Sequence, residues 1–397
     1  MPDNITFSNR ISSLQPSAIR EILKYTFEPG YISFAAGNPS AEAFPVEQAQ
    51  SLCRKILDED PVTALQYGST EGYAPLREQV KSLLKSRYGI SRDCDEVIIT
   101  SGAEQVMDLC AKVLCNEGDT VICENPSFIG SLNAFKSYGC KLAGVDMEPD
   151  GMNIVLLEQA LKDNPNTKFI YTIPNFQNPT GYTTSLEKRK AIYALAEKYN
   201  VFILEDNPYG ELRVAGEGLP DIKSFDRSGR VIYAGTFSKI FSPGIRVGYV
   251  CAESRIVSKM TVGKQTSDVH TPMLCQMLVS EWLKEYDLDA HINEIRKVYK
   301  RKLSLMSGLL KSELFDFLTF HEPQGGLFIW CRLPDGVDVA EFCRAALEAK
   351  VAVVPGNAFS VDENEKSHYI RLNFSTPEDG EIEKGIKTLK SVAKEFN

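Results

Sequence analysis

The sequence has no apolar run long enough to cross a bilayer, and no basic stretch followed by an apolar one at its start. Its ten cysteines include no Cys-x-x-Cys pair, and its four histidines are isolated from one another and from the cysteines. A clustered zinc site is therefore not expected, and the cysteines are predicted to be reduced. We expect a cytoplasmic protein without a metal site or a membrane partner.

Basic blocks, internal repeats and low-complexity tracts are also missing. The chain carries 44 lysines and arginines against 53 aspartates and glutamates, a formal net charge of −9. Without a basic face, nucleic acid is not a predicted partner. A length of 397 residues, of which 43% are hydrophobic and 24% charged, is typical of a globular enzyme with two or three domains.

Short β-branched apolar runs alternate with helical segments between residues 96 and 250. This alternation predicts an α/β fold with a largely parallel sheet that helices cover on both faces. Ligands of such sheets bind at the carboxyl ends of the strands. The predicted strands are Val97–Thr100, Thr120–Cys123, Phe169–Ile173, Val201–Leu204, Val231–Ala234 and Val247–Val250.

Three parts are predicted along the chain. Residues 1–44 combine a helix-prone segment with a turn-rich stretch and form an N-terminal arm. Residues 45–290 contain the alternating strands and helices and form a large domain. Residues 291–397 begin in long helices and then mix short strands with helices, which predicts a smaller α+β domain. The boundary near residue 290 falls inside helical material.

Lys239 follows the apolar run Val231–Ala234 on a turn, with Thr236 and Ser238 just before it and Arg246 seven residues beyond. A buried lysine loses its proton readily and forms a Schiff base with a carbonyl, whereas hydroxyls and a guanidinium suit a phosphate. Pyridoxal phosphate needs both. A strand end with a solvated lysine has the same local pattern. The residues at the other strand ends are therefore needed to distinguish a cofactor lysine from a solvated one.

Two further predicted strands end in residues that suit such a cofactor. Ser101, Gly102 and Ala103 open a helix whose first amides can hold a phosphate, although a plain serine N-cap has the same sequence. Phe128 can stack on a pyridine ring or pack in the core. For both the Ser101–Ala103 turn and Phe128, cofactor binding and a purely structural role remain open.

Polar residues occupy three more of these positions. Asn178 lies in a rigid turn and can donate to a ring oxygen, as can Tyr209; a plain loop is the alternative. Asp206 ends a buried strand, where it can pair with a pyridinium nitrogen or form a structural ion pair. Arg371 lies in the apolar strand Tyr369–Phe374 and requires a carboxylate, either from a substrate or from the protein.

As an ordered set, these motifs resemble the class I/II aminotransferases among the fold-type I pyridoxal-phosphate enzymes. The resemblance runs from Gly37-Asn38-Pro39 through Gln177-Asn178-Pro179-Thr180-Gly181 and Asp206-Asn207-Pro208-Tyr209 to Ser238-Lys239 and Arg371. It implies pyridoxal 5'-phosphate as cofactor, a mostly parallel seven-stranded sheet in the large domain, and a homodimer. The arm and Phe44-Pro45 are most similar to the subgroup acting on 2-aminoadipate, kynurenine and aromatic amino acids.

The resemblance also implies a role for each residue. Lys239 would hold the cofactor and then move a proton as the base, with Asp206 on the ring nitrogen and Tyr209 and Asn178 on the ring oxygen. Phe128 takes a stacking position where many relatives have tyrosine. The residues implied for the phosphate are Ser101, Gly102, Ala103, Thr236, Ser238, Arg246 and, from the partner subunit, the residue equivalent to Tyr67.

The substrate would be held by Arg371, Asn178 and Gly37, with Arg20 as a mobile residue near its side chain. The predicted reaction is transfer of an amino group from an L-amino acid to a 2-oxo acid such as 2-oxoglutarate. A lyase or decarboxylase of the same fold type is the nearest alternative. A cofactor-binding regulatory module is less favoured, because only roughly forty residues precede the family core and they contain no helix-turn-helix.

Overall fold

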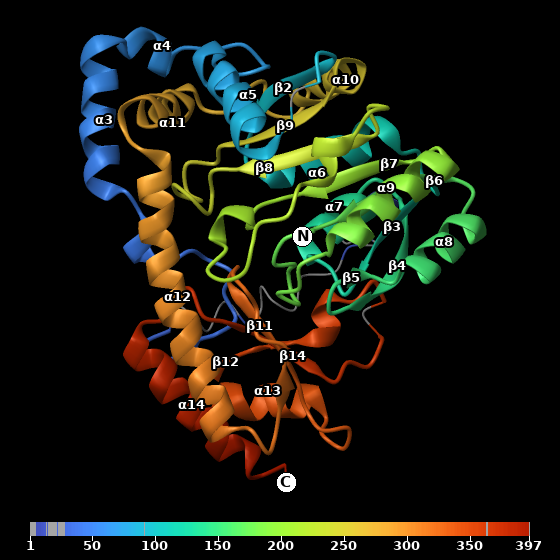
Figure 1. Cartoon of the computed structure of the whole chain (residues 1–397), viewed down its shortest axis with the longest axis vertical. Helices are drawn as coiled ribbons and strands as arrows, with labels where there is room; N and C mark the ends of the chain where they lie inside the picture. Colours follow the sequence, from blue (N-terminus) through green and yellow to red (C-terminus); the bar gives the residue numbers. More distant parts are fainter. Residues whose placement is uncertain are drawn as a thin grey trace.

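The computed structural model describes residues 5–12, 14, 22, 28–90, 92–362 and 364–396 (Figure 1). Within these ranges, no helix is both long and apolar enough to span a membrane. The described residues form three sheets, of eight, four and two strands. Helices surround the eight-stranded large sheet, and the four-stranded small sheet lies to one side of it (Figure 1).

The large sheet has eight strands in the order β2-β9-β8-β7-β6-β3-β4-β5. Strands β8, β7, β6, β3 and β4 are parallel, whereas β9 runs antiparallel to both β8 and β2. The bounds are β2 Asp95–Thr100, β3 Thr120–Asn125, β4 Lys141–Glu148, β5 Gly151–Met152, β6 Thr167–Thr172, β7 Phe202–Asp206, β8 Val231–Thr236 and β9 Gly248–Glu253.

The sheet differs from the sequence prediction at one edge. Seven strands were expected, and the eighth, β5, is a two-residue strand that pairs antiparallel with β4. No strand was predicted at the position of β4. This strand lies near the edge and most of its residues are partly or fully exposed, so it lacks the continuous apolar run that marks the central strands.

Alternate residues of the central strands pack against helices on opposite faces of the sheet. In β8, Ile232 and Ala234 belong to one apolar cluster with α6 and α10, whereas Val231 and Tyr233 face clusters on the other side. The covering helices are α3 Val46–Glu59, α4 Pro61–Leu65, α5 Ala74–Tyr88, α6 Ala103–Leu114, α7 Ile129–Lys136, α8 Ile154–Asp163, α9 Leu186–Tyr199, α10 Ser254–Gln265 and α11 Met273–Glu285.

The small sheet is antiparallel and has the order β10-β11-β14-β13. Its strands are β10 Thr319–Phe320, β11 Phe328–Arg332, β13 Val354–Pro355 and β14 Tyr369–Asn373, and its helices are α12 Leu288–Glu313, α13 Val339–Glu348 and α14 Asp379–Ala393. Strand β1 (Ile32–Ser33) pairs with β12 (Val351–Ala352), which attaches the N-terminal region to this part of the chain. The short elements are α1 Asn9–Ser12 and the 3-10 turns η1 Ala41–Ala43, η2 Gly210–Leu212, η3 Ile222–Phe225 and η4 Gly356–Phe359.

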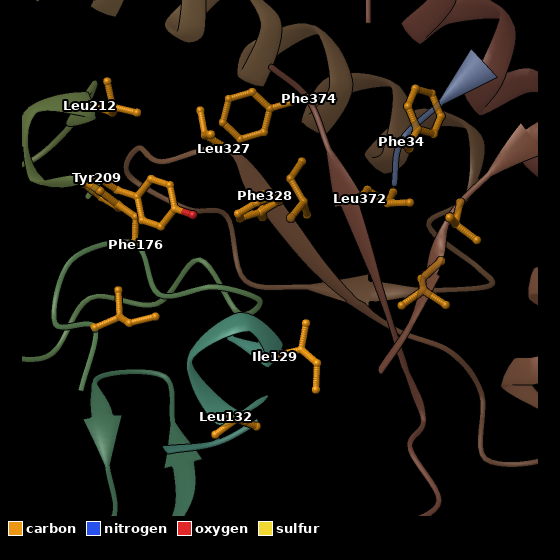
Figure 2. Close-up of a cluster of buried hydrophobic side chains, with 14 of the residues drawn as sticks. Phe34, Ile129, Leu132, Phe176, Tyr209, Leu212, Leu327, Phe328, Leu372 and Phe374 are labelled. Atoms are coloured by element: carbon orange, nitrogen blue, oxygen red, sulfur yellow. The ribbon is translucent and has the colours of Figure 1, made fainter. Parts of the chain in front are cut away.

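The 26-residue helix α12 extends from beside the large sheet to the helices of the small sheet (Figure 1). It crosses the predicted boundary at residue 290, and the division into residues 1–44, 45–290 and 291–397 stays a prediction. The apolar core is also continuous between the two sheets. Figure 2 shows Tyr209 and Phe176, from loops of the large sheet, close to Phe328 of β11.

Candidate active site

A cavity of about 500 Å³ lies where the carboxyl ends of β7 and β8 face the small sheet. Asp206 and Thr236 are the last residues of these two parallel strands, which is where α/β sheets bind ligands. Most of the predicted site lines this one cavity: Gly37, Ala103, Phe128, Asn178, Asp206, Tyr209, Thr236, Ser238, Lys239, Arg246 and Arg371.

Lys239 projects into the cavity from the turn after β8. Its Nζ donates a hydrogen bond to the Gly37 carbonyl oxygen at 3.1 Å. Burial of the amine, together with the positive charges of Arg246 and Arg371, lowers the pKa of Lys239 to about 8. A substantial fraction of this amine is therefore neutral near physiological pH, as a nucleophile or a general base requires.

Asp206 has one carboxylate oxygen held and the other free. The Tyr171 hydroxyl donates to Oδ2 at 3.0 Å, and Ser131 Oγ donates in turn to Tyr171 at 2.8 Å. Oδ1 is buried without a hydrogen-bond partner among the described residues, and burial raises the pKa of Asp206 to about 7. A protonated ring nitrogen is the partner that this oxygen lacks, so Asp206 fits a pyridine cofactor.

Sequence reasoning missed Tyr171, although a signal was present. Tyr171 is fully buried in β6, and a buried tyrosine hydroxyl requires a hydrogen-bond partner. The parallel register places it beside Leu204 of β7, two residues before Asp206. A tyrosine within a predicted core strand therefore indicated a nearby polar group, but not which one.

One end of the cavity gathers groups of the kind that suit a phosphate. Gly102, the N-cap of α6, has φ +80°, and a Cβ on it would collide with the Arg246 guanidinium. Arg246 Nη2 donates to the Ser101 carbonyl oxygen at 3.0 Å, and Thr236 Oγ1 donates to Ser238 Oγ at 2.8 Å. The first amides of α6, two hydroxyls and a guanidinium are thereby gathered at one place. We call it the phosphate end.

The side chain of Ser101 turns away from the cavity, unlike the rest of the predicted phosphate set. Its Oγ donates to Asp268 Oδ2 at 2.6 Å, and its amide donates to Gln105 Oε1 at 2.8 Å. Lys264, which is fully buried, donates to the same Gln105 oxygen at 2.6 Å and to Asp268 Oδ2 at 2.9 Å. This network was not foreseen, because a lone lysine in an amphipathic helix carries no local signal.

Aromatic and amide groups form the middle of the cavity. Phe128, at the start of α7, lines it beside Gly130, on which a Cβ would lie 2.6 Å from the Phe128 ring. Tyr209 packs edge-on against Phe328, with 6.1 Å between ring centroids, and burial raises the pKa of its hydroxyl. The Tyr209 hydroxyl is therefore protonated at neutral pH and interacts with Asn178 by a hydrogen bond.

Arg371, on β14, forms the opposite end, which we call the substrate end. Its Nη1 donates to Asn178 Oδ1 at 2.8 Å and its Nη2 to the Ala35 carbonyl oxygen at 2.6 Å, and the guanidinium lies 4.2 Å from the Phe328 ring centroid. Nε is buried without a partner, and no carboxylate of the described residues pairs with it. Burial lowers the pKa of Arg371, and a buried cation without a counter-charge fits a substrate carboxylate.

Among the described residues of the predicted site, Tyr67 does not line the cavity of the single chain, and neither do Ser101 and Gly102. Tyr67 is 81% exposed, and its ring meets the His270 ring edge-on at 5.8 Å. Arg20 lies outside the described residues. Gly37, in contrast, is where it was expected, and a Cβ there would approach the Phe328 ring at 3.2 Å.

Comparison with known proteins agrees with this geometry. The family model for aminotransferase class I and II matches residues 29–389. Aromatic-amino-acid aminotransferase 1 of Thermococcus litoralis is 38% identical over 393 residues, which are 98% of this chain and 94% of that protein. The chain therefore belongs to the class I and II aminotransferase family.

Two solved structures share the whole fold. Pyrococcus horikoshii kynurenine aminotransferase in complex with PMP has a TM-score of 0.94 at 38% identity, over 98% of this chain and 97% of that one. Thermus thermophilus α-aminoadipate aminotransferase, complexed with N-(5'-phosphopyridoxyl)-L-leucine, has a TM-score of 0.90 at 37% identity, over 98% and 97%. The protein is thus a fold-type I aminotransferase that depends on pyridoxal phosphate and moves an amino group between an amino acid and a 2-oxo acid.

Proposed function

We propose that the protein transfers the amino group of an L-amino acid with a long acidic or an aromatic side chain, such as 2-aminoadipate, to 2-oxoglutarate. The observation that carries the proposal is the pair of unsatisfied atoms on residues that line one cavity, Asp206 Oδ1 and Arg371 Nε. One suits a ring nitrogen and the other a substrate carboxylate. The relatives that are aromatic-amino-acid, kynurenine and α-aminoadipate aminotransferases support this choice of donors.

The residues that would hold pyridoxal phosphate come from five segments. The amides of Gly102 and Ala103, with Thr236, Ser238 and Arg246, would bind its phosphate, while Phe128 would face its ring. Lys239 would be its covalent anchor, Asp206 would hold the ring nitrogen, and Tyr209 and Asn178 would bind the ring oxygen. When bound, this cofactor supplies an electron sink for the pair of electrons left as the substrate α-carbon loses its proton.

The chain itself positions the substrate and moves the proton. Arg371 binds the substrate carboxylate by a bidentate pair and fixes the direction of the Cα–H bond. Lys239 Nζ, neutral above its pKa of about 8, would take the proton from the substrate Cα and deliver it to the cofactor carbon on the other side of the amino nitrogen. The carbonyl of Gly37, which accepts a hydrogen bond from this amine, helps to hold it in place.

Replacement of the lysine tests the assignment of the base. Lys239→Ala is expected to lower kcat by at least about 10⁴-fold, because both the covalent anchor and the proton carrier are lost. Lys190→Ala, at an exposed lysine of α9, is the matched control and should retain wild-type turnover. Near wild-type turnover of Lys239→Ala would refute the assignment.

A donor panel tests the substrate class and the type of reaction. Each amino acid is incubated with 2-oxoglutarate, and the oxo acid, glutamate and ammonia are measured. Equal amounts of oxo acid and glutamate mean transfer, whereas ammonia with pyruvate means elimination. If acidic, aromatic and long-chain donors were all inert while small apolar donors reacted, the proposed donor class would be wrong.

We further propose a homodimer with shared active sites. Val62, Leu65 and Tyr67 are 73%, 74% and 81% exposed along α4 and the turn after it, an apolar surface that suits a second copy. In the dimer, Tyr67 of each subunit would reach the phosphate in the other. Mixing Tyr67→Ala with Lys239→Ala subunits should then restore up to about one quarter of wild-type activity, because one of the two sites in a hybrid is intact. A monomer in sedimentation equilibrium would contradict the proposal.

A cytoplasmic location also stays a proposal. All ten cysteines are free, four of them at intermediate or exposed positions, which is consistent with a reducing compartment. Cell fractionation with an antibody against the chain would test it, and recovery in a secreted fraction would contradict it.

A further inference from the structure

Glu104 is an acidic residue at the phosphate end of the cavity. It is the second residue of α6 and lines the cavity together with Ala103 and Arg246. Neither a hydrogen bond nor an ion pair connects its carboxyl to another residue of the described ranges. A carboxylate here is unexpected in one respect, because the surrounding amides, hydroxyls and guanidinium favour an anionic ligand.

The position of the carboxyl can be located from its neighbours. A Cβ built on Gly130 would lie 3.0 Å from Glu104 Oε2 and 2.6 Å from two carbons of the Phe128 ring. The carboxyl therefore lies beside Phe128, between the first turns of α6 and α7. A group bound against the amides of α6 and facing Phe128 comes close to it.

The charged groups around Glu104 act in opposite directions. Arg246, from the loop after β8, favours the ionised carboxyl, whereas Asp108 on α6 disfavours it. Asp206, from β7, feels the negative charge of Glu104 as a repulsion. Lys239 lines the same cavity. Together with burial, these groups raise the pKa of Glu104 to about 7, so its charge changes within the physiological range.

A phosphate changes this balance. An ionised carboxylate next to a phosphate is a pair of like charges in a partly closed cavity, whereas a neutral carboxyl is a hydrogen-bond donor that a phosphate oxygen accepts. The same side chain therefore repels or binds the phosphate according to its protonation. Thr236, Ser238 and the amides of α6 carry no proton that dissociates near neutral pH.

We propose that Glu104 binds the phosphate of pyridoxal 5'-phosphate through its neutral carboxyl and weakens that binding when ionised, so that the protein holds its cofactor less firmly as the pH rises. The inference rests on the assignment of the phosphate end within the proposed function. It adds a ligand to the phosphate and makes uptake of one proton part of cofactor binding. Its test does not require turnover.

The experiment is a titration of apoenzyme with pyridoxal 5'-phosphate between pH 6 and pH 9, followed by quenching of protein fluorescence. Wild type and Glu104→Gln are compared, because glutamine has the shape of the neutral acid and no dissociable proton. The measured quantity is the ratio of their dissociation constants, in which the titrations of Lys239 and of the cofactor's own phosphate cancel. We expect a ratio of about 1 at pH 6 that rises to about 10 at pH 9, the loss of one charge-assisted hydrogen bond.

Two controls separate this role from a structural one. Pyridoxal, which lacks the phosphate, should show a much smaller change of this ratio with pH, because only the repulsion between Glu104 and Asp206 acts on its binding. Glu104→Ala should bind pyridoxal phosphate more weakly than wild type at pH 6, where the neutral carboxyl donates its hydrogen bond. The ratio of the dissociation constants of Glu104→Ala and Glu104→Gln should not change with pH, because neither variant has a proton to lose at this position. A wild-type to Glu104→Gln ratio that stays constant from pH 6 to pH 9 would overturn the inference, as would an equal effect on pyridoxal. Failure of the donor panel would leave this binding result unaffected, so the two proposals fail separately.

Discussion

The two ends of the cavity are built in different ways. At the phosphate end, the fixed polar groups are bonded to one another: Thr236 to Ser238, Arg246 to Ser101, and Ser101 to Asp268. At the substrate end, Arg371 is anchored on two oxygens but keeps a buried nitrogen without a partner among the described residues. The hydroxyls and the guanidinium of the first end already have protein partners, whereas the guanidinium of the second end has no counter-charge among the described residues.

This difference corresponds to what each end must do. A cofactor that stays through both half-reactions is best held by groups already fixed in place, because no ordering cost accompanies its binding. A substrate must enter and its product must leave in every half-reaction. A cation that has no counter-charge of its own, such as Arg371, binds a carboxylate by supplying what the site lacks, without first breaking an internal ion pair. The two ends should therefore respond separately to mutation.

The largest expected separation comes from Arg371→Leu. Loss of the bidentate pair should cost about 3–4 kcal/mol, which corresponds to a fall of about 10²–10³-fold in kcat/KM. The dissociation constant for pyridoxal phosphate should change less than about twofold, since this end does not hold the phosphate. Steady-state kinetics and a cofactor titration measure both, with Arg371→Lys as an intermediate variant. Equal losses in both quantities would show that the two ends are coupled.

The converse experiment is Lys264→Met at the phosphate end. Without the ammonium, the turn that contains Ser101 and Gln105 loses its support, and affinity for pyridoxal phosphate should fall about tenfold while KM for the amino donor is unchanged. Affinity for pyridoxal should not change, which separates positioning of the phosphate from general destabilisation.

Two variants serve as references for Lys264→Met. Lys112→Met removes a lysine that bonds Gly263 and Ser267 nearby, without touching the turn, and should retain full affinity. Lys264→Arg should recover part of the loss. If Lys112→Met and Lys264→Met had equal effects, Lys264 would be a stabilising residue and not a positioning one.

The smallest expected effect concerns Asp206, which lies between the two ends. Its pKa in the folded apoenzyme is about 7, above its value in the unfolded chain, so this carboxyl contributes most to stability at low pH. That contribution declines as the pH rises and is lost once the pH passes about 7. In Asp206→Asn the side chain does not ionise, so it loses no stability at this position as the pH rises. Its Tm as apoenzyme should exceed that of wild type by a few degrees at pH 8, and the difference should shrink toward pH 4. A difference independent of pH would contradict this interpretation.

Much of the candidate site could be predicted from short stretches of sequence. Lys239, Asp206 and Gly102 each follow a β-branched run, and parallel strands bring such positions to one edge of a sheet whatever lies between them. The helix that opens at Ala103 was equally readable, because a small-residue turn before an amphipathic segment marks a helix start. The strands β4 and β5 at the edge of the sheet could not be predicted, since exposed strands lack the continuous apolar run that marks the central strands.

The sequence by itself determined the family, the fold class and the residues at the strand ends, because these depend on local patterns that repeat in a known order. Only the tertiary structure decided the state of those residues. It placed Tyr171 behind Asp206, turned Ser101 toward Asp268, set Glu104 in the lining of the cavity and brought Arg371 to a carbonyl 336 positions away. The burial of these side chains and their hydrogen-bond partners depend on contacts between segments distant in the sequence, which no local pattern encodes.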